Sequence, residues 1–418
     1  MNYVLIGAGS RGMVYANYAH AHGDGIAAIA EVRPERLAHA GEVLNVPADR
    51  RFTDPAQLFA LGKIADAAII ATMDRDHCGH VMQALDCGYD ILLEKPISPD
   101  PAECVRIEAR ANALGRKITV CHVLRYTPFF MTVKRILDSG ELGKVVAIKH
   151  SENIGNFHMA HSFVRGNWAN SDRSSPIIMQ KSCHDMDILL WLTGSHCTRV
   201  ASFGSLTYFK PENAPAGAAD RCCICPAAKD CRFEARKVYL PVLGTWPADV
   251  VCLEQTEEAM LEALKTSPYG RCVFHCDNNV CDHMSTILEF ENGVTATFSL
   301  TAQTNRIHRN IHIMCENGEL IGDDDEGLIT VNHFTSNEVQ SYETRTLHIL
   351  GTDGGHNGGD PALMQDFTAS LTNPAGDSRS SITRSVESHL MASAVEKARV
   401  TGQVVSLADF RREVSAEK

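Results

Sequence analysis

The sequence predicts an α/β protein with two unlike parts: a doubly wound parallel sheet over residues 1–125, and a C-terminal α/β domain over residues 126–418 with an open, mostly antiparallel sheet. Three observations predict this class. A glycine-rich turn follows the first apolar run, short apolar runs then alternate with helical stretches, and longer β-like runs replace that alternation after about Tyr126. With 418 residues, 44% of them hydrophobic, the chain has enough apolar material for two cores.

The glycine turn begins directly after residues 3–6, the first apolar run, and has the spacing G-x-G-x-x-G. In such a turn the first glycine allows the bend, the second lets the backbone approach a pyrophosphate, and the third lets the following helix pack closely on the strand. The helix start then offers free N–H groups to the phosphates. The sequence therefore predicts a Rossmann domain, with a cofactor-binding turn made of Gly7, Gly9, Ser10, Arg11 and Gly12.

The second predicted strand, residues 26–30, ends at Glu31, nineteen residues after Gly12. An acidic side chain at this place accepts hydrogen bonds from the hydroxyl groups of the adenosine ribose, which favours NAD as the cofactor. Arg33 lies two residues further on and keeps NADP open as an alternative.

Three more strands are expected in this part, at residues 67–72, 91–93 and 118–120. Helical stretches separate them, and two of these begin with Asp-Pro pairs, at residues 54–55 and 100–101, which are typical of an N-cap followed by a first-turn proline. Gly88 lies where a helix end needs a glycine. Strands and helices that alternate in this way predict a parallel sheet with helices on both faces.

The C-terminal part has longer β-like runs, expected at residues 145–149, 285–290, 294–300 and 308–314. Residues 291–293, Glu-Asn-Gly, join two of these runs, and alternating apolar residues flank them on both sides. This pattern predicts a β-hairpin within an antiparallel sheet.

Charge and targeting signals restrict the class of protein. Asp and Glu number 51 against 39 Lys and Arg, so the net charge of −12 argues against a nucleic acid or an anionic membrane as the partner. The chain has no run of 18 apolar residues and no secretory leader pattern at its start. We therefore expect a cytoplasmic protein with a small-molecule substrate.

Three further segments carry a family resemblance: residues 71–77 (ATMDRDH), residues 93–96 (LEKP) and residues 184–187 (HDMD). Together with the glycine turn, they resemble the Gfo/Idh/MocA family of sugar and cyclitol oxidoreductases. The resemblance implies an NAD(P)-dependent enzyme that acts on a carbohydrate and forms homo-oligomers, dimers or tetramers, through the exposed face of the C-terminal sheet. It also implies further cofactor contacts, from Thr72, His77, Glu94 and Lys95.

By the same resemblance, Lys95 is a catalytic residue that lies close to the nicotinamide and helps to move a proton, and Pro96 is the family's often cis proline. His184 is the second catalytic candidate. Ser182 and Asp185 have capping-box spacing, so a helix should run from Ser182 to Gly194, with His184 in its first turn. The helix dipole there favours a neutral imidazole, which can accept a proton.

Asp187, three residues after His184, is the third catalytic candidate and could hold either the imidazole or the substrate. Many relatives have an aspartate four residues before the histidine, whereas this chain has Gln180 there, followed by Lys181. Two interpretations stay open: Asp187 replaces that carboxylate, or Lys181 and Lys95 form a cationic pair in which one pKa is lowered.

Polar and aromatic residues between Asn153 and Trp168 could line a sugar site. A polar glycine-rich loop at residues 354–360 provides two more candidates for substrate contact, His356 and Asp360. The expected substrate-binding residues are Arg125, Tyr126, His158, Arg165, Trp168, Lys181 and His184.

Fifteen cysteines are present, and eight of them lie between Cys222 and Cys281. In a reducing compartment such crowding suggests a metal rather than disulfides. We expect a Cys-rich insertion around residues 220–283, with little apolar material of its own, stapled by structural zinc; an iron–sulfur cluster is the alternative. The expected ligands are Cys222, Cys225, Cys231 and Cys272.

Three functions are therefore open. The first is an NAD-dependent oxidoreductase that takes hydride from a secondary hydroxyl of a sugar, cyclitol or glycoside. The second is an NAD-dependent glycosidase with no net redox change, which oxidises a sugar hydroxyl, eliminates the aglycone, adds water and reduces the sugar again. The third is a non-catalytic NAD(P) or sugar sensor.

Overall fold

The structure is a computed structural model, and it describes residues 1–335, 342–351, 355–373 and 376–416. Within them, the first sheet has the strand order β3-β2-β1-β4-β5-β6, and every pairing is parallel. Its strands are β1 (Asn2–Ile6), β2 (Gly25–Ala30), β3 (Arg51–Phe52), β4 (Ala67–Ile70), β5 (Asp90–Leu93) and β6 (Ile118–Val120). The predicted parallel sheet is confirmed, except that β3, with two residues, was too short to give an apolar signal. The strand order reverses between β1 and β4, where such sheets bind ligands.

Helices flank this sheet and begin where the sequence predicted. Asp54 and Asp100 accept hydrogen bonds from the N–H groups of Ala56 and Ala102, at 2.9 and 2.8 Å, so both predicted N-caps are confirmed. The helices are α1 (Ser10–Ala21), α2 (Pro34–Val43), α3 (Pro55–Phe59), α4 (His77–Asp86) and α5 (Pro101–Leu114), with 3₁₀ turns at Ala48–Arg50, Asp74–Asp76 and Val123–Tyr126.

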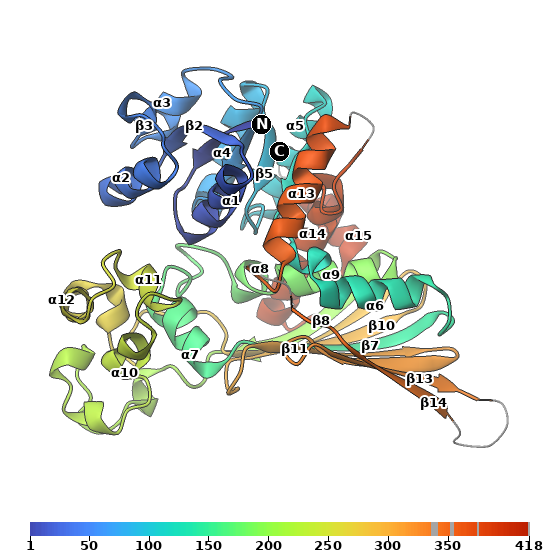
Figure 1. Cartoon of the computed structure of the whole chain (residues 1–418). Helices are drawn as coiled ribbons and strands as arrows, with labels where there is room; N and C mark the ends of the chain where they lie inside the picture. Colours follow the sequence, from blue (N-terminus) through green and yellow to red (C-terminus); the bar gives the residue numbers. More distant parts are fainter. Residues whose placement is uncertain (336–341, 352–354, 374–375, 417–418) are drawn as a thin grey trace.

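The second sheet, which lies below the first in Figure 1, has nine strands in the described residues, in the order β14-β13-β12-β11-β7-β10-β9-β8-β15. Only the β7–β10 pair among them is parallel, so the predicted mostly antiparallel sheet is confirmed. The predicted hairpin joins β9 to β10 through Gly293, whose φ of 84° suits glycine. The strands are β7 (Val145–Asn153), β8 (Cys197–Ser205), β9 (His283–Phe290), β10 (Thr295–Thr301), β11 (His308–Cys315), β12 (Gly318–Asp323), β13 (Leu328–Phe334), β14 (Tyr342–His348) and β15 (Val405–Ser406).

Helices cover one face of the second sheet and connect it to the first (Figure 1). Helix α14 packs on β8 and α9 and also contacts α5 of the N-terminal layer, while α13 packs on α1. The C-terminal helices thus tie the two layers together. They are α6 (Pro128–Asp138), α8 (Ile177–Gln180), α9 (Cys183–Thr193), α13 (Gly359–Thr372), α14 (Ile382–Thr401) and α15 (Leu407–Ala416).

A separate lobe lies between β8 and β9 and contains the Cys-rich segment. It consists of short helices, α10 (Ala235–Tyr239), α11 (Ala248–Val251) and α12 (Glu257–Thr266), with 3₁₀ turns. The expectation that it lacks apolar material is wrong, because it buries a core of its own: Cys222, Ala235, Tyr239, Ala248, Met260, Leu264 and Tyr269.

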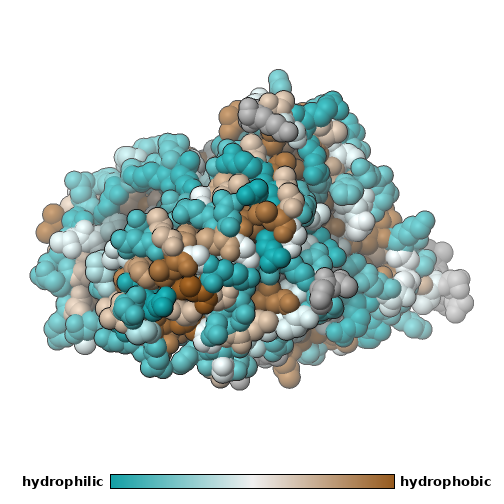
Figure 2. Space-filling view, turned by 90° about the horizontal axis from the view of Figure 1, so that it is seen from above, coloured by the Kyte–Doolittle hydropathy of each residue, from teal (hydrophilic) through white to brown (hydrophobic). Residues whose placement is uncertain are grey.

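The outer surface is largely hydrophilic when viewed from above the N-terminal layer, with hydrophobic residues confined to patches (Figure 2). Across the described ranges, none of the helices combines the length and the apolar character needed to cross a membrane.

Candidate active site

The glycine turn follows β1 with the geometry that a dinucleotide requires. Gly7 has a φ of 91°, and a Cβ atom added to Gly12 would lie 2.0 Å from the carbonyl oxygen of Gly7. Gly9 forms the N-cap of α1 without any side-chain capping bond, and the space beside its Cα is open. The free N–H groups at this helix start and the absent side chain together fit a pyrophosphate.

Glu31 lies at the carboxyl end of β2, beside this turn. Its Oε2 accepts a hydrogen bond from the N–H of Ala8 at 2.9 Å, and its Oε1 accepts from the N–H and Nε of Arg33 at 3.1 and 3.2 Å. A carboxylate fixed in this position fits the hydroxyl groups of an adenosine ribose. Arg33, which kept NADP open, is itself paired with that carboxylate.

The segments after β4 and β5 are joined by His77. Its Nδ1 lies 2.7 Å from the carbonyl oxygen of Pro96, and its Nε2 lies 3.1 Å from that of Thr72. The Lys95–Pro96 peptide bond is cis, as the resemblance implied. Because the ring of His77 is buried and both nitrogens meet backbone oxygens, this residue shapes the two segments that carry Thr72 and Lys95.

The side chains of Lys95 and Glu94 have different hydrogen-bond partners. Lys95 Nζ donates to the carbonyl oxygen of Gln180 at 2.7 Å, whereas Glu94 accepts from Arg11 Nε at 2.9 Å and from the Tyr15 hydroxyl at 2.7 Å. Burial alone would raise the pKa of Glu94, but the charges of Arg11 and Lys95 outweigh it and lower that pKa. Glu94 is therefore an ionised anchor between the glycine turn and Lys95.

His184 lies in the first turn of α9 and is buried. Burial lowers the pKa of its imidazole well below the ordinary value, and the positive charge of Lys95 lowers it further. The predicted neutral ring is thus supported, although the leading cause is burial and not the helix dipole. The predicted capping box is wrong: Ser182 makes no capping bond, and Asp185 instead accepts from His150 and Arg309, both at 2.8 Å.

Asp187 does not hold His184. Both of its oxygens accept from Arg125, at 2.6 Å from Nε and 2.7 Å from Nη2, in a buried pair. Within the described part of the chain, Nδ1 of His184 has no hydrogen-bond partner. Arg125 and Tyr126, both expected to bind substrate, instead bond to other side chains. Arg125 pairs with Asp187, and the Tyr126 hydroxyl donates to Asp366 at 2.8 Å.

Lys181 has a carboxylate partner that the sequence did not reveal. Its Nζ lies 3.2 Å from Glu152 of β7, which also pairs with the buried Arg309. Burial lowers the pKa of Lys181, against the opposing charge of Glu152. The expected cationic pair is therefore replaced by an ion pair. Glu152 lies at an inward position of β7, and a carboxylate at such a position is the signal that could have revealed it.

The residues expected to line a sugar site, between Asn153 and Trp168, lie in different surroundings. Burial lowers the pKa of His158 well below the ordinary value, and Lys181 and Lys95 contribute, so His158 lies near both lysines. Arg165 instead holds the Cys-rich lobe: it donates to the carbonyl oxygens of Arg271 and Phe233, both at 2.7 Å. The Trp168 ring packs against the main core, and its carbonyl oxygen accepts from the Gln180 side chain at 3.1 Å.

The four expected metal ligands line one small cavity together with Arg165. Among the residues that the structure describes, however, no three His, Cys, Asp or Glu side chains are arranged to hold a metal ion. Burial raises the pKa of the Cys222 and Cys272 thiols, and Arg165 donates to Cys222 Sγ at 3.3 Å. The expected zinc or iron–sulfur centre at Cys222, Cys225, Cys231 and Cys272 is therefore unsupported, because the lobe has a hydrophobic core instead.

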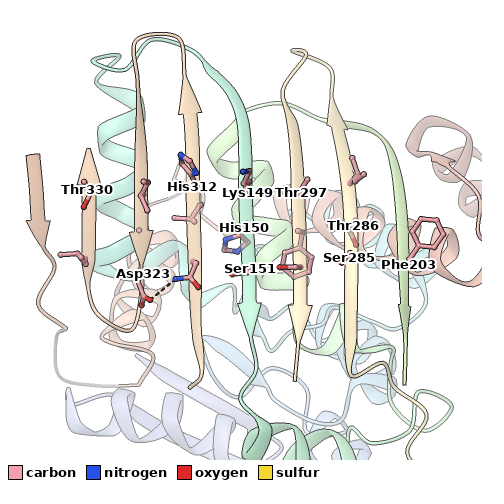
Figure 3. A pocket seen from close by; sticks show the side chains of 18 of the residues that line it. Lys149, His150, Ser151, Phe203, Ser285, Thr286, Thr297, His312, Asp323 and Thr330 are labelled. Atoms are coloured by element: carbon pink, nitrogen blue, oxygen red, sulfur yellow. Dashed lines mark hydrogen bonds between the residues drawn. The ribbon is translucent and has the colours of Figure 1, made fainter. Parts of the chain in front are cut away.

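A hollow of about 650 Å³ lies on the uncovered face of the second sheet (Figure 3). Its lining includes Lys149, Phe203, Thr286, Thr297 and His312, from adjacent strands. None of the expected site residues lines it, so this hollow is separate from the group around Lys95 and His184.

Two family models match the chain. One, described as an oxidoreductase family with an NAD-binding Rossmann fold, matches residues 1–122, and the other, described as the C-terminal alpha/beta domain of an oxidoreductase family, matches residues 134–407.

Similar proteins include YteT of Bacillus subtilis (strain 168), whose name describes it as an oxidoreductase; it is 23% identical over 72% of each chain. Inositol 2-dehydrogenase 4 of Saccharopolyspora erythraea is 26% identical over 52% of this chain and 60% of its own length. Among solved structures, levoglucosan dehydrogenase with NADH and levoglucosan has a TM-score of 0.70 at 16% identity, covering 97% of this chain and 99% of that one. An oxidoreductase from Agrobacterium radiobacter, in complex with NAD⁺, L-tartaric acid and magnesium, has a TM-score of 0.70 at 17% identity, covering 98% and 99%.

Proposed function

Because the chain belongs to the Gfo/Idh/MocA family of NAD-binding oxidoreductases, we propose that it is an NAD-dependent dehydrogenase acting on a secondary hydroxyl of a sugar, cyclitol or glycoside. The observation that carries this proposal is that Lys95, on the cis peptide after β5, lies close enough to His184 of α9 for its charge to lower the pKa of that imidazole. Two proton-carrying side chains lie there next to the expected place of the nicotinamide.

In this proposal the glycine turn and Glu31 hold NAD, which when bound supplies the hydride acceptor. Lys95 positions the substrate hydroxyl, since its Nζ is fixed by the Gln180 carbonyl oxygen. His184 accepts the proton of that hydroxyl, because its imidazole is neutral at physiological pH. The third candidate, Asp187, contributes indirectly by holding Arg125 beside α9.

The substrate class is supported by similarity and by local chemistry. Relatives include inositol 2-dehydrogenases and levoglucosan dehydrogenase, which act on polyhydroxylated rings. In this chain the charges of Lys181 and Lys95 both act on His158, and these side chains can hydrogen-bond such hydroxyl groups. We also propose a boundary between two domains at residues 125 and 126, and a cytoplasmic location, which cell fractionation would test.

A homo-oligomer, a dimer or a tetramer, is part of the same proposal. The uncovered face of the second sheet presents Phe203 and Ile287, whose exposed fractions are 70% and 60%. Large apolar side chains exposed on one face favour an interface with another protein surface.

The test is to incubate the protein with NAD and a panel of sugars, inositols and nitrophenyl glycosides, and to record NADH and nitrophenol together. We expect NADH to form from a free sugar or polyol. Lys95→Met should lower kcat about 10²-fold or more while leaving NAD binding unchanged, because the cofactor is held mainly by other residues. Lys63→Met, at an exposed lysine on the N-terminal layer, is the control.

Two results would contradict the proposal. Nitrophenol release that needs NAD but accumulates no NADH would indicate the redox-neutral glycosidase. A wild-type protein that binds NAD and a sugar but turns over neither class of substrate would indicate a sensor.

A further inference from the structure

A histidine–carboxylate pair lies at the start of α13. Nδ1 of His356 is 3.0 Å from Oδ2 of Asp360. The Asp360 side chain is only 2% exposed, whereas that of His356 is 42% exposed. A buried carboxylate in this position keeps the imidazole hydrogen on Nδ1 and leaves the lone pair of Nε2 available. Nδ1 also lies 3.4 Å from Nη1 of Arg11.

The backbone bends sharply to form this pair. His356 and Asn357 have φ angles of 50° and 51°, and Gly358 follows with 86°. Two successive non-glycine residues in the left-handed region are uncommon, and such conformations occur often at functional sites. The turn brings the His356 ring back onto Asp360, four residues later.

Arg11 connects this pair to the cofactor turn. Its Nη2 and Nη1 donate to the two oxygens of Asp360, at 2.6 and 3.0 Å, and its Nε donates to Glu94 at 2.9 Å. The other oxygen of Glu94 accepts the N–H of Lys95 at 2.9 Å. A continuous series of hydrogen bonds therefore runs from His356 through Asp360, Arg11 and Glu94 to the backbone of Lys95.

His184, on α9, is the other histidine to compare with His356. The charge of His356 is one of the influences that lower the pKa of His184, so the two rings lie within electrostatic range. His184 has no carboxylate partner in the described chain, because position 180 is glutamine and Asp187 is bound to Arg125. Of the three side chains Lys95, His184 and His356, only His356 has a recorded hydrogen bond to a carboxylate among the described residues.

We propose that His356, in place of His184, is the acid–base residue that accepts the hydroxyl proton, that His184 hydrogen-bonds the substrate, and that Asp360 and Arg11 are the positioning residues of His356. The proposal rests on the proposed function, since it needs a polyhydroxylated substrate beside Lys95. The carboxylate–imidazole relay that Gln180 removes next to His184 is then supplied from the start of α13.

The proposed step transfers one proton from a substrate hydroxyl to Nε2 of His356. The lone pair on Nε2 forms a bond to the proton of a substrate hydroxyl, the O–H bond breaks, and its electron pair stays on the oxygen. That pair becomes the second bond of the carbonyl as the carbon gives up its hydride to the nicotinamide. Asp360 balances the charge of the imidazolium, and the exposed ring passes the proton to water.

The test compares His356→Asn with a matched control, His283→Asn. His283 is 50% exposed, and its Nδ1 lies 2.9 Å from the 2%-exposed carboxylate of Asp282, but this pair has no recorded contact with Arg11 or Glu94. We expect His356→Asn to lower kcat about 10²-fold or more, to remove one ionisation from the pH profile of kcat, and to leave the Kd for NAD unchanged. Added imidazole should restore part of the lost rate, and the control should behave as wild type.

A kcat and pH profile of His356→Asn equal to those of the control would overturn the proposal. A second measurement does not need turnover: the NMR resonance of His356, identified by its loss in the variant, should shift when NADH is added. If wild type turns over no substrate but this resonance shifts, the proposed function fails while the position of His356 at the site stands. If the protein binds NADH but the His356 resonance does not shift, His356 does not lie at the site and the proposal fails.

Discussion

Single residues in this protein are fixed mainly by buried ion pairs. Arg125 donates two hydrogen bonds to Asp187 in the interior, and Asp185 and Glu152 both pair with Arg309. Such pairs add little net stability compared with apolar residues, but the loss of one partner leaves an unbalanced buried charge. They orient α9, so that His184 and its neighbours keep their positions.

We predict that Asp187→Asn lowers the free energy of unfolding at pH 7 by about 3–5 kcal/mol. Burial raises the pKa of Asp187, but Arg125 and His122 outweigh it, so the folded pKa lies below the ordinary value. The folded state then binds fewer protons than the unfolded state, and the stabilisation is present above the unfolded pKa of about 3.9 and is lost below it. The difference between wild type and variant should therefore narrow as pH falls from 5 to 3.

Urea unfolding at several pH values measures this effect. Asp138→Asn, at an exposed aspartate paired with Lys134, is the control and should change stability by less than about 0.5 kcal/mol. A gap between wild type and Asp187→Asn that stays constant with pH would refute the assignment.

At the scale of elements, the Cys-rich lobe has an apolar core of its own. Its helices α10 and α12 pack around Met260, Leu264 and Tyr239, and Arg165 joins the lobe to the rest of the chain through the carbonyl oxygens of Arg271 and Phe233. Burial of these side chains and satisfied backbone oxygens provide the stabilisation that zinc was expected to provide.

We predict that a chelator such as EDTA leaves the Tm of the protein unchanged, because the lobe is held by apolar packing. Met260→Ala should instead destabilise it by about 2–5 kcal/mol, since the residue is fully buried. Differential scanning calorimetry with and without EDTA measures both effects. A large fall in Tm with EDTA, together with stoichiometric zinc in the purified protein, would reinstate the metal centre.

For the whole molecule, the arrangement of layers separates two surfaces. Helix α14 packs on α5 of the N-terminal layer and on β8 of the second sheet, and α9, which carries His184, lies on the same face of that sheet. The opposite face of that sheet stays uncovered and contains the hollow of Figure 3. The proposed catalysis and the proposed assembly therefore use opposite faces of one sheet.

We predict that Ile287→Lys reduces an oligomer to a smaller species, because it places a charge at the centre of the uncovered face. Val400→Lys is the control, since Val400 is similarly exposed but belongs to α14. Size-exclusion chromatography with light scattering measures the mass. Wild-type protein that is a monomer at all concentrations would contradict the proposed assembly.

The sequence by itself determined the features that depend on neighbouring residues. The glycine turn, the Asp-Pro helix starts and the hairpin at Gly293 were predicted because local sterics and capping bonds decide them within a few residues. The cis bond before Pro96, in contrast, was implied by the family resemblance and is confirmed.

Only the tertiary structure decided which side chains meet. Arg125 pairs with Asp187 across 62 positions and Arg11 with Asp360 across 349, while Asp187, three residues from His184, turns away from it. The four cysteines line one cavity yet form no metal-binding group in the described chain. Which side chains pair depends on the directions in which they point. Packing over the whole chain sets those directions, so the spacing of residues along the sequence cannot predict the pairs.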